Sequence, residues 1–295
     1  MRPFFENNVL QQQPFKPMII VVDTTKTGSA SNTFVLPIIK AASEVVKIYW
    51  GDGTNSTGVN GNNTHVYAAS GIYTVKIESR LFGGIYFNNL GDKAKITKIA
   101  NYGQGVSRLN IGSFYGCSSL LSIDIGNIVS NGADASNQYR DCTALTTVPL
   151  FNLSSVTNAT GMFAYCAALT TVPLFNLSNC TSTWVMFYQC SNITTVPLFD
   201  LSKVTNATSM FYQCAALTTV PLLNLSSCTN ASYMFLGVTL TTQSYSDFLI
   251  NLATLPLQSG VTFSGGNSKY NVAGGVARAY LVSNFGWTIT DGGAA

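Results

Sequence analysis

The sequence predicts a mainly β protein: an N-terminal β-sandwich, then a solenoid of short repeats, then a C-terminal α/β cap. The main observation is a regular cysteine spacing. Residues Cys117, Cys142, Cys166, Cys190 and Cys214 follow one another at intervals of 25, 24, 24 and 24 residues. Repetition at such a period is typical of a solenoid, in which each unit contacts only its neighbours. The other two observations are β-rich segments before the repeats and a helix-then-strand pattern after them.

Each of the last four cysteines begins the phrase C-x-x-[LI]-T-T-V-P-L, and several later positions stay apolar in every copy. These positions predict interior columns: Leu145, Leu169, Ile193 and Leu217; Val148, Val172, Val196 and Val220; Leu153, Leu177, Leu201 and Leu225; Met162, Met186, Met210 and Met234; Phe163, Phe187, Phe211 and Phe235. The β-branched T-T-V run predicts a short strand near Leu145 to Val148 in each copy, ended by proline. The stretch ending in Met-Phe predicts a helical or 3₁₀ turn on the opposite wall. Each copy then advances the stack by about 4.8 Å.

The residues of this repeat resemble the BspA-like leucine-rich repeat, whose signature combines a Met-Phe pair, a cysteine and a V-P-L-F-[DN]-L-S-x-V-T-N motif. The resemblance covers Phe114 to Gly237, and Phe114 to Ile125 is similar to a degenerate first copy. Residues Ser268 to Gly293 are similar to the closing segment of such arrays, with a helix over Ala273 to Asn284 and a strand over Trp287 to Thr290. A cap is physically required, because an open solenoid end would expose its core to water.

The cysteines have three interpretations. Cys180 and Cys228 occupy a position where sister copies carry Val156 and Val204, which indicates a small buried apolar residue. A disulfide between neighbouring rungs would strain a regular stack. Zinc is disfavoured further, because sulfurs on a straight ladder at strand spacing do not converge on one tetrahedral ion. We therefore predict structural thiols.

Before the repeats, four segments read as strands because they are β-branched or aromatic and are bounded by turn-forming residues. They are Met18 to Val22, Thr33 to Ile39, Val45 to Trp50 and Tyr73 to Glu78. The phrases VVKIYWGDGT and HVYAASGIYTVKI resemble the PKD-like, immunoglobulin-type β-sandwich. This resemblance implies that Trp50 and Tyr67 lie in the sandwich interior or at its edge.

Asp52 and His65 belong to the same two phrases. Asp52 lies in a Gly-Asp-Gly turn, and a turn-forming role is preferred over calcium binding. His65, which is the single histidine of the chain, is interpreted as structural and not catalytic.

Charge and hydropathy exclude several classes of protein. Only 9% of residues are charged, the net charge is +3, and the four full repeats contain just Asp200 and Lys203. A nucleic-acid footprint is therefore not supported. No apolar stretch reaches the ~20 residues of a membrane span. We expect no nucleic-acid partner, no membrane insertion, no metal and no cofactor.

The predicted organisation has five parts. These are an extended N-terminal arm (1–16), a PKD-like β-sandwich (17–82), a connector with the solenoid N-cap (83–112), the leucine-rich repeats (113–237) and a C-terminal cap (238–295).

The composition of the N-terminal arm indicates where the protein acts. It is polar, contains two prolines and lacks the apolar region of a secretory signal. The arrangement of arm, PKD-like domain and BspA-like repeats also resembles virion proteins of phages of Bacteroidetes-type hosts. We therefore expect a phage fibre, spike or decoration subunit, anchored to other virion proteins through Arg2, Phe4, Phe5 and Phe15. A bacterial cell-surface adhesin and a purely architectural decoration protein remain alternatives, and homo-oligomerisation stays open.

No catalytic constellation is visible. The chain has no G-x-S-x-G elbow and no P-loop, and Asp124, Asp134 and Asp141 fit surface loops as well as a catalytic groove. We expect no enzyme.

The residues near the Met-Phe pairs that differ between copies form a candidate binding face for a host-surface glycan or protein. It consists of Tyr165, Trp184, Tyr188, Gln189, Tyr212 and Gln213. Aromatic rings and amides in a row can stack on sugars and bond to their hydroxyls, while the alternative is that the tyrosines simply pack between rungs.

Overall fold

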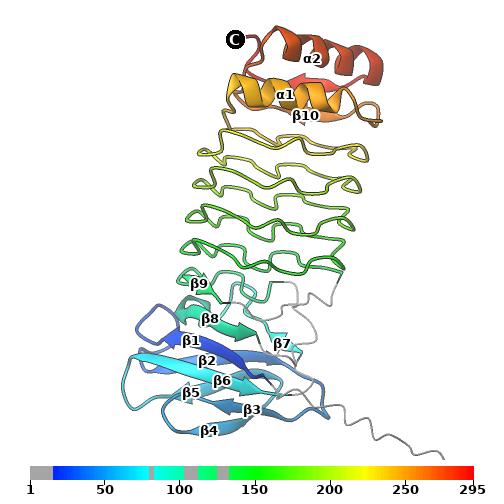
Figure 1. Ribbon diagram of the computed structural model, residues 1–295. Coiled ribbons are helices and arrows are strands. Elements are labelled where there is room, and N and C mark those ends of the chain that lie inside the picture. The colour runs from blue at the N-terminus through cyan, green and yellow to red at the C-terminus, as the bar shows by residue number, and fades with distance from the viewer. Residues whose placement is uncertain (1–15, 80–82, 103–111, 125–132) are drawn as a thin grey trace, which may run out of the picture.

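The protein is elongated, with β-sheets at the N-terminal end, a stack of flat rungs in the middle and two helices at the C-terminal end (Figure 1). The computed structural model describes residues 16–79, 83–102, 112–124 and 133–295. The predicted anchor residues Arg2, Phe4, Phe5 and Phe15 lie outside these residues.

Two sheets form the N-terminal part. A six-stranded sheet has the order β4-β3-β6-β1-β8-β9, and a three-stranded sheet has the order β5-β2-β7. The strands are β1 (Met18–Asp23), β2 (Thr33–Ile39), β3 (Val46–Tyr49), β4 (Asn55–Gly58), β5 (Gly61–Val66), β6 (Ile72–Glu78), β7 (Gly84–Ile85), β8 (Ile96–Tyr102) and β9 (Ser122–Ile123). The four strands predicted from the sequence correspond to β1, β2, β3 and β6, with ends that differ by at most one residue.

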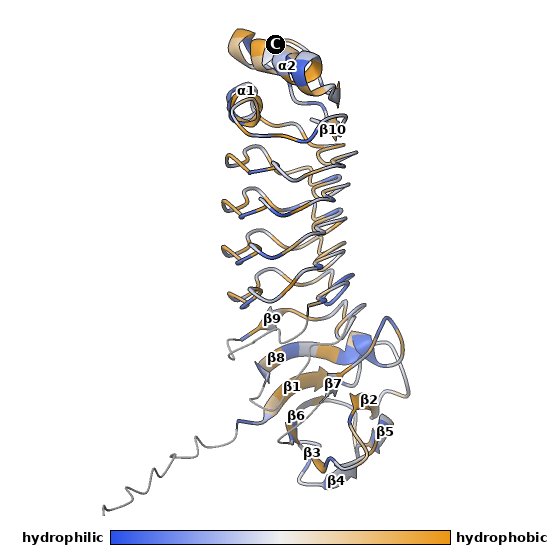
Figure 2. Ribbon diagram, turned by 90° about the vertical axis from the view of Figure 1, so that its right-hand side faces the viewer, coloured by the Kyte–Doolittle hydropathy of each residue, from blue (hydrophilic) through white to orange (hydrophobic). Residues whose placement is uncertain are grey.

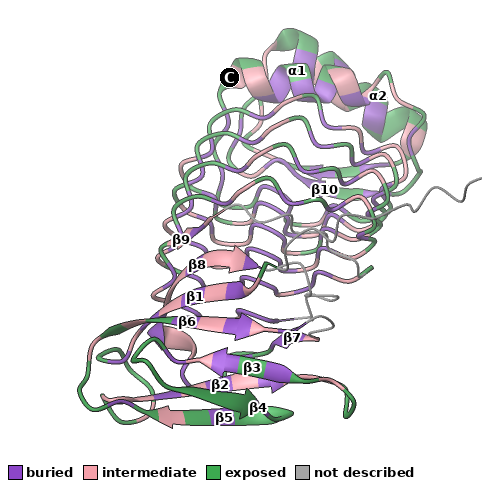
Figure 3. Ribbon diagram, turned by 60° about the horizontal axis from the view of Figure 1, so that its bottom comes forward, coloured by how far each residue is buried: buried purple, intermediate pink, exposed green. Residues whose placement is uncertain are grey.

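The strands β1 and β2 bury every second side chain, because alternate residues of a strand point to opposite faces (Figure 3). The buried side chains of the two sheets meet between them: a Cβ built on Gly58 of β4 would lie 3.2 Å from Cδ1 of Ile38 on β2. Trp50 and Tyr67 are buried in this core, as predicted.

The six-stranded sheet continues into the solenoid. β8 pairs antiparallel with β1 on one side and parallel with β9 on the other. β9 belongs to the first repeat, so the edge of the N-terminal sheet is covered by the first rung. An edge strand that is paired in this way exposes no free row of backbone donors and acceptors.

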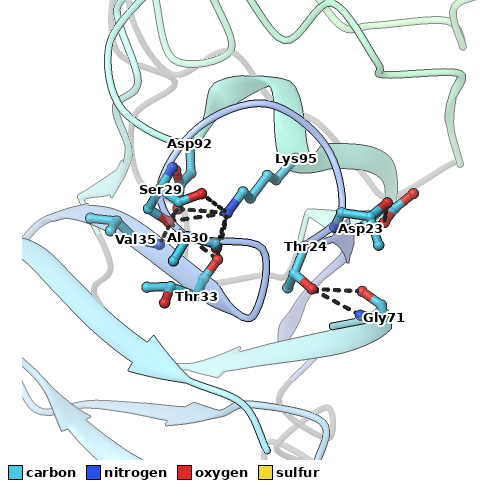
Figure 4. Close-up of polar contacts among 10 residues, drawn as sticks. Asp23, Thr24, Ser29, Ala30, Thr33, Val35, Gly71, Asp92 and Lys95 are labelled. Carbon is cyan, nitrogen blue, oxygen red and sulfur yellow. Dashed lines mark hydrogen bonds and ion pairs between the residues drawn. The ribbon is translucent and has the colours of Figure 1, made fainter. Parts of the chain in front are cut away.

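A buried ion pair fixes the loop between β1 and β2 (Figure 4). Lys95 and Asp92, on and just before a 3₁₀ helix (Lys93–Lys95), are 0% and 1% exposed, and their charged groups lie 3.8 Å apart. Lys95 Nζ donates to the carbonyl oxygens of Ser29, Ala30 and Thr33 and to the hydroxyl of Ser29. Asp92 accepts from the amides of Ser29 and Val35 and from the Ser29 hydroxyl. Both buried charges are therefore hydrogen-bonded, as burial requires.

Backbone hydrogen bonds between successive rungs form a ladder on the side of the solenoid that carries the Met-Phe pairs, which we call the Met-Phe wall. The amides of Ala159, Gly161, Phe163 and Tyr165 donate to the carbonyls of Ser182, Trp184, Met186 and Tyr188 in the next copy at 2.7–3.0 Å. The intervening amides close tight turns instead: Met162 N donates to Ala159 O, and Ala164 N to Gly161 O. These turns have the i to i+3 bonds of a 3₁₀ turn, which is one of the two predicted forms, and no regular helix forms in this stretch of the described repeats.

The predicted strand near Leu145 to Val148 is wrong. No regular strand forms there in the described repeats, and the T-T segments of neighbouring copies share single, longer bonds, such as Thr170 N to Thr146 O at 3.2 Å. The proline that follows each valine has no N–H to continue a ladder.

In each rung, the turns of the Met-Phe wall need two residues with a left-handed backbone conformation. Positive φ recurs five residues and one residue before each column cysteine, and before Val238, which takes the place of the cysteine in the last rung. The first set is Gly112, Asn137, Gly161, Val185, Ser209 and Tyr233, and the second is Gly116, Asp141, Tyr165, Gln189, Gln213 and Gly237. This conformation is unfavourable for residues with a Cβ, and for a β-branched residue such as Val185 it is a genuine outlier. Most of these residues have to be held in the left-handed region by the ladder on both sides.

The interior columns predicted from the repeat are buried in every copy. A further column was not predicted: Phe151, Phe175, Phe199 and Leu223 interleave with the Met-Phe phenylalanines. Ring centroids of Phe163, Phe187, Phe211 and Phe235 follow at 5.7, 5.7 and 5.5 Å, nearly parallel. The solenoid core is therefore a continuous stack of aromatic rings, flanked along each rung by alternating apolar and polar segments (Figure 2).

All seven cysteines are free and buried, which confirms the prediction of structural thiols. The thiol of Cys166 donates to the carbonyl of Tyr139 at 3.1 Å, and that of Cys190 to Phe163 at 3.0 Å. Burial raises the pKa of these thiols. Each column cysteine from Cys142 onwards thus ties its own rung to the preceding one.

Uncharged polar residues add a side-chain ladder outside the core. The hydroxyls of Thr157, Thr181, Thr205 and Thr229 each donate to a carbonyl of the preceding copy at 3.1 Å. Because these bonds join identical positions, they explain why the repeats favour threonine over charged residues, which would repel their equivalents one rung away.

The C-terminal cap contains α1 (Thr242–Leu252), β10 (Thr262–Ser264), α2 (Val272–Phe285) and β11 (Thr288–Thr290), and β10 pairs parallel with β11. The predicted helix and strand correspond to α2 and β11. α1 was not predicted, and it packs closely on α2, where a Cβ on Gly274 would lie 2.8 Å from the Ser246 side chain. Among the described residues, no helix is long and apolar enough to cross a membrane.

Candidate functional site

The candidate binding face predicted from the sequence forms one continuous surface on the Met-Phe wall. Its centre is a ladder of Tyr115, Arg140, Tyr165, Tyr188 and Tyr212, one side chain from each of five successive rungs, which we call the tyrosine-arginine ladder. The Arg140 guanidinium lies 5.7 Å from the Tyr115 ring centroid and 5.0 Å from that of Tyr165. The tyrosine rings of the ladder then follow at 5.2 and 4.5 Å.

The part of the ladder nearest the cap is the most regular. Tyr188 and Tyr212 stack with an interplanar angle of 1°. Beside them, Gln189 Nε2 donates to Gln213 Oε1 at 2.9 Å. The pKa of the Tyr188 hydroxyl is raised by its partial burial and by the neighbouring Tyr165 and Tyr212. The predicted packing of tyrosines between rungs is therefore present, and it leaves ring edges and hydroxyls at a half-buried surface.

A hollow of about 380 Å³ opens at the middle of the ladder. It is lined by Asn137, Arg140, Thr160, Tyr165, Trp184, Val185 and Tyr188. The copies differ at this point: one carries the small pair Thr160-Gly161, and the next carries Trp184-Val185 at the same positions. Trp184 is 47% exposed and is the one tryptophan in the repeats. The hollow thus exists because the repeat is broken there.

Arg140 is held in place mainly by the aromatic rings. Its Nη1 donates to Asn137 Oδ1 at 3.4 Å, and its Nε is buried without a hydrogen-bond partner. No ion pair involves Arg140 in the part of the chain that the structure describes. Asp141, the next residue, has a raised carboxyl pKa, because burial outweighs the opposing effects of Arg140 and Lys93.

Chemically, this surface suits recognition more than reaction. It offers tyrosine ring edges and hydroxyls, the exposed Trp184 side chain, amide groups and one guanidinium, but no imidazole or thiol. Within the described ranges, no group of three or more His, Cys, Asp or Glu residues is placed to hold a metal ion. Aromatic faces with a few convergent polar groups are typical of ligand sites.

The other residues considered from the sequence lie elsewhere. Asp124 forms an ion pair with Lys98 at 2.7 Å. Asp134 accepts from the amide and hydroxyl of Ser136 and from Asn158, in a turn. These two carboxylates have structural partners.

Asp52 forms a turn, as its position between two glycines predicts. Its Oδ1 accepts from the amide and hydroxyl of Thr54, and its Oδ2 lies 2.7 Å from His65 Nε2. Burial alone would raise the pKa of Asp52, but the hydrogen bonds from Thr54 and His65 together outweigh it and lower the pKa to about 2.

Five residues of the site were missed in the sequence: Tyr115, Asn137, Arg140, Thr160 and Val185. A signal was present, because Tyr115, Arg140, Tyr188 and Tyr212 all stand two residues before a column cysteine. Tyr165 stands one residue before its cysteine, after the small Ala164, and its ring nevertheless takes the place in the ladder. A comparison of equivalent repeat positions for polar and aromatic residues identifies the tyrosine-arginine ladder from the sequence.

Fold and surface together define the class: a repeat protein with mostly β N-terminal sheets, a stacked aromatic core and two C-terminal helices. Residues 133–248 match a family described as "Mycoplasma protein of unknown function, DUF285". This is a repeat family related to the BspA-like leucine-rich repeat, and the matched segment contains the four complete repeats. No curated protein and no solved structure matches the chain.

Proposed function

We propose that this protein is a non-enzymatic attachment protein whose solenoid binds glycans on a host surface through the tyrosine-arginine ladder. The observation that carries the proposal is the row of half-buried rings interrupted by a hollow beside the exposed Trp184. The exposed Trp184 side chain can stack on the apolar face of a sugar ring, while the tyrosine hydroxyls and the amides of Gln189 and Gln213 can bond to sugar hydroxyls. A core held by packing and backbone bonds presents these groups on a rigid support.

We further propose that the particle carrying the protein is a phage virion, with the chain as a fibre, spike or decoration subunit. This finer proposal rests on the resemblance of the sequence to phage proteins that combine PKD-like and BspA-like segments. A bacterial cell-surface adhesin is the second candidate, because the sequence resembles the BspA-like repeat of bacterial surface proteins and residues 133–248 match a repeat family related to it. An antibody against this chain separates the two: labelled phage particles support the virion, and labelled host cells that carry no phage support the adhesin.

The binding function is tested with the double variant Tyr188→Ala/Tyr212→Ala. Both rings belong to the ladder and neither belongs to the apolar core, so we expect the fold to persist and glycan-array binding to fall by at least tenfold, given about 1–3 kcal/mol for each stacked ring by analogy with base stacking. Tyr280→Ala is the control, because Tyr280 is a tyrosine on α2, outside the tyrosine-arginine ladder, and its 45% exposure makes its removal mild for the fold.

Circular dichroism and the melting temperature establish that each variant is folded. Unchanged array binding, or unchanged adsorption of otherwise normal particles carrying the double variant, would show that the ladder is not the binding surface. The protein would then be interpreted as a purely architectural decoration subunit.

A further inference from the structure

We infer that the hollow between Arg140 and Trp184 binds the acidic group of an anionic sugar, with the neighbouring aromatic rings binding the sugar ring itself. This inference rests on the proposed glycan-binding function and specifies its ligand class. It follows from four properties of the hollow: a guanidinium with unused donors, the fixed orientation of that guanidinium, a local charge that favours an anion and an aromatic wall.

The first property is the state of the Arg140 side chain. A guanidinium has five N–H donors in a planar fork that matches carboxylate and sulfate oxygens. In the structure, one of these donors makes a long bond of 3.4 Å to Asn137, and Nε is buried without a partner. The Nη groups make no other hydrogen bond among the described residues, and an anion at the edge of the guanidinium would supply acceptors for them.

The second property is that the guanidinium is already oriented. Tyr115 and Tyr165 flank it from the rungs on either side, at 5.7 and 5.0 Å. Such stacking holds the plane of the fork without using its donors. The ligand therefore does not have to bear the full cost of ordering a flexible arginine on binding.

The third property is the local charge. The residues that line the hollow include no acidic side chain, and the four full repeats contribute only Asp200 and Lys203 elsewhere. Lys93 is close enough to act electrostatically on Asp141, so a second cation lies on the same side of the first rungs. Asp141 itself forms no ion pair with Arg140 among the described residues. The Asp141 carboxylate does act electrostatically on Arg140 and Lys93, but it is one negative charge beside two positive ones, so the field at the hollow favours an anion.

The fourth property separates an acidic sugar from a free inorganic anion. Tyr165, Trp184 and Tyr188 line the same hollow, and about half of the Trp184 side chain is exposed. An inorganic ion would use none of this apolar surface. A hexose ring with a carboxylate or sulfate ester can place its C–H face on a ring and its acidic group on Arg140. The volume of about 380 Å³ lies within the range for small-ligand sites.

The test measures binding of the full chain to three probes by isothermal titration calorimetry. Tetragalacturonate carries carboxylates, its fully methyl-esterified form has the same sugar rings without charge, and a κ-carrageenan tetrasaccharide carries sulfate esters. We expect one or both acidic probes to bind at least tenfold more tightly than the ester, with affinity falling as salt is raised.

Arg140→Gln removes the charge and keeps a hydrogen-bonding side chain. This variant should lose roughly tenfold or more in affinity for the acidic probe and little for the ester, because a hydrogen bond to a charged group is worth about 1.5–3 kcal/mol. Lys203→Gln is the matched control, since it removes one positive charge from the solenoid outside the hollow. Arg140→Lys should restore only part of the affinity, because an ammonium cannot form the planar fork.

The outcomes distinguish this inference from the function on which it rests. Equal affinity for the acidic probes and the ester, or unchanged affinity in Arg140→Gln, would overturn the anionic-sugar inference while leaving glycan binding intact. If the folded protein binds no probe and is also negative on a broad glycan array, both proposals fail.

Discussion

Replacing Gly161 by alanine tests the left-handed positions on which the whole Met-Phe wall depends. Gly161 has φ +61° and its amide donates to Trp184 O of the next rung at 2.9 Å. A Cβ added there would collide with Oδ1 of Asn137 on the preceding rung. The substitution therefore combines an unfavourable backbone conformation with a steric clash between two rungs.

The expected magnitude follows from three contributions. The left-handed conformation costs about 1–2 kcal/mol for a residue with a Cβ. Alanine recovers about 0.4–1 kcal/mol, because it lowers the entropy of the unfolded chain. The clash is with the end of the half-buried Asn137 side chain, which can turn away, so crowding adds about 1 kcal/mol, the lower end of the cost of overpacking. We expect a net loss of about 2 kcal/mol in the free energy of unfolding.

Urea unfolding followed by circular dichroism measures the loss, and amide hydrogen exchange of residues 159–165 reports whether the wall itself has loosened. Gly91→Ala is the matched control: its φ is +57°, and nothing lies within 4 Å of the added Cβ, so it should cost only about 1 kcal/mol. Adding Asn137→Gly to Gly161→Ala should recover the steric part. A loss for Gly161→Ala no larger than that for Gly91→Ala would refute the reasoning.

Three further predictions concern stability and reactivity. The seven thiols should not react with Ellman's reagent in the folded protein and should all react in denaturing urea, because they are buried and burial raises the pKa of Cys214, for example, to about 12; fast reaction of the native protein would contradict this. Lys95→Met should lower the free energy of unfolding in urea by about 3–5 kcal/mol, because it leaves the Asp92 charge buried without its partner. A loss below about 1 kcal/mol would argue against a stabilising role of the Lys95–Asp92 ion pair. Asp52 should stabilise the fold above about pH 4, and this contribution should disappear as the pH falls toward 2, because its carboxyl pKa is lowered from 3.8 to about 2 in the native state. Asp52→Asn should therefore flatten the pH dependence of the urea midpoint between these values, and an unchanged slope would contradict the assignment.

Much of the fold follows from local patterns. The strands β1, β2, β3 and β6 have the alternation and flanking turns that define a strand, and the interior columns follow from apolar letters repeated at one period. The wrong strand at T-T-V has a clear cause: β propensity measures how well a side chain fits a pleated surface, and it does not say which backbone amides face the next rung. The actual ladder runs through residues with poor β propensity, such as Gly161.

The candidate site was predicted only in part. Tyr188, Tyr212, Gln189 and Gln213 were predicted because they vary against a constant background, and the structure brings them together. Arg140 was missed, because its role arises from rings on two other rungs. α1 was missed although Thr241 caps its first turn and its apolar residues follow helical spacing.

The sequence by itself determined the period, the interior columns, the uncharged polar exterior and the burial of the cysteines, because identical letters at one spacing must occupy equivalent places in a stack. Tertiary structure decided where the backbone ladder runs, which residues adopt positive φ and where the hollow opens. These features depend on which atoms of one rung face the next, and no single repeat contains that information. The hollow opens where the large Trp184 follows the smaller Thr160 at the equivalent position of the preceding rung.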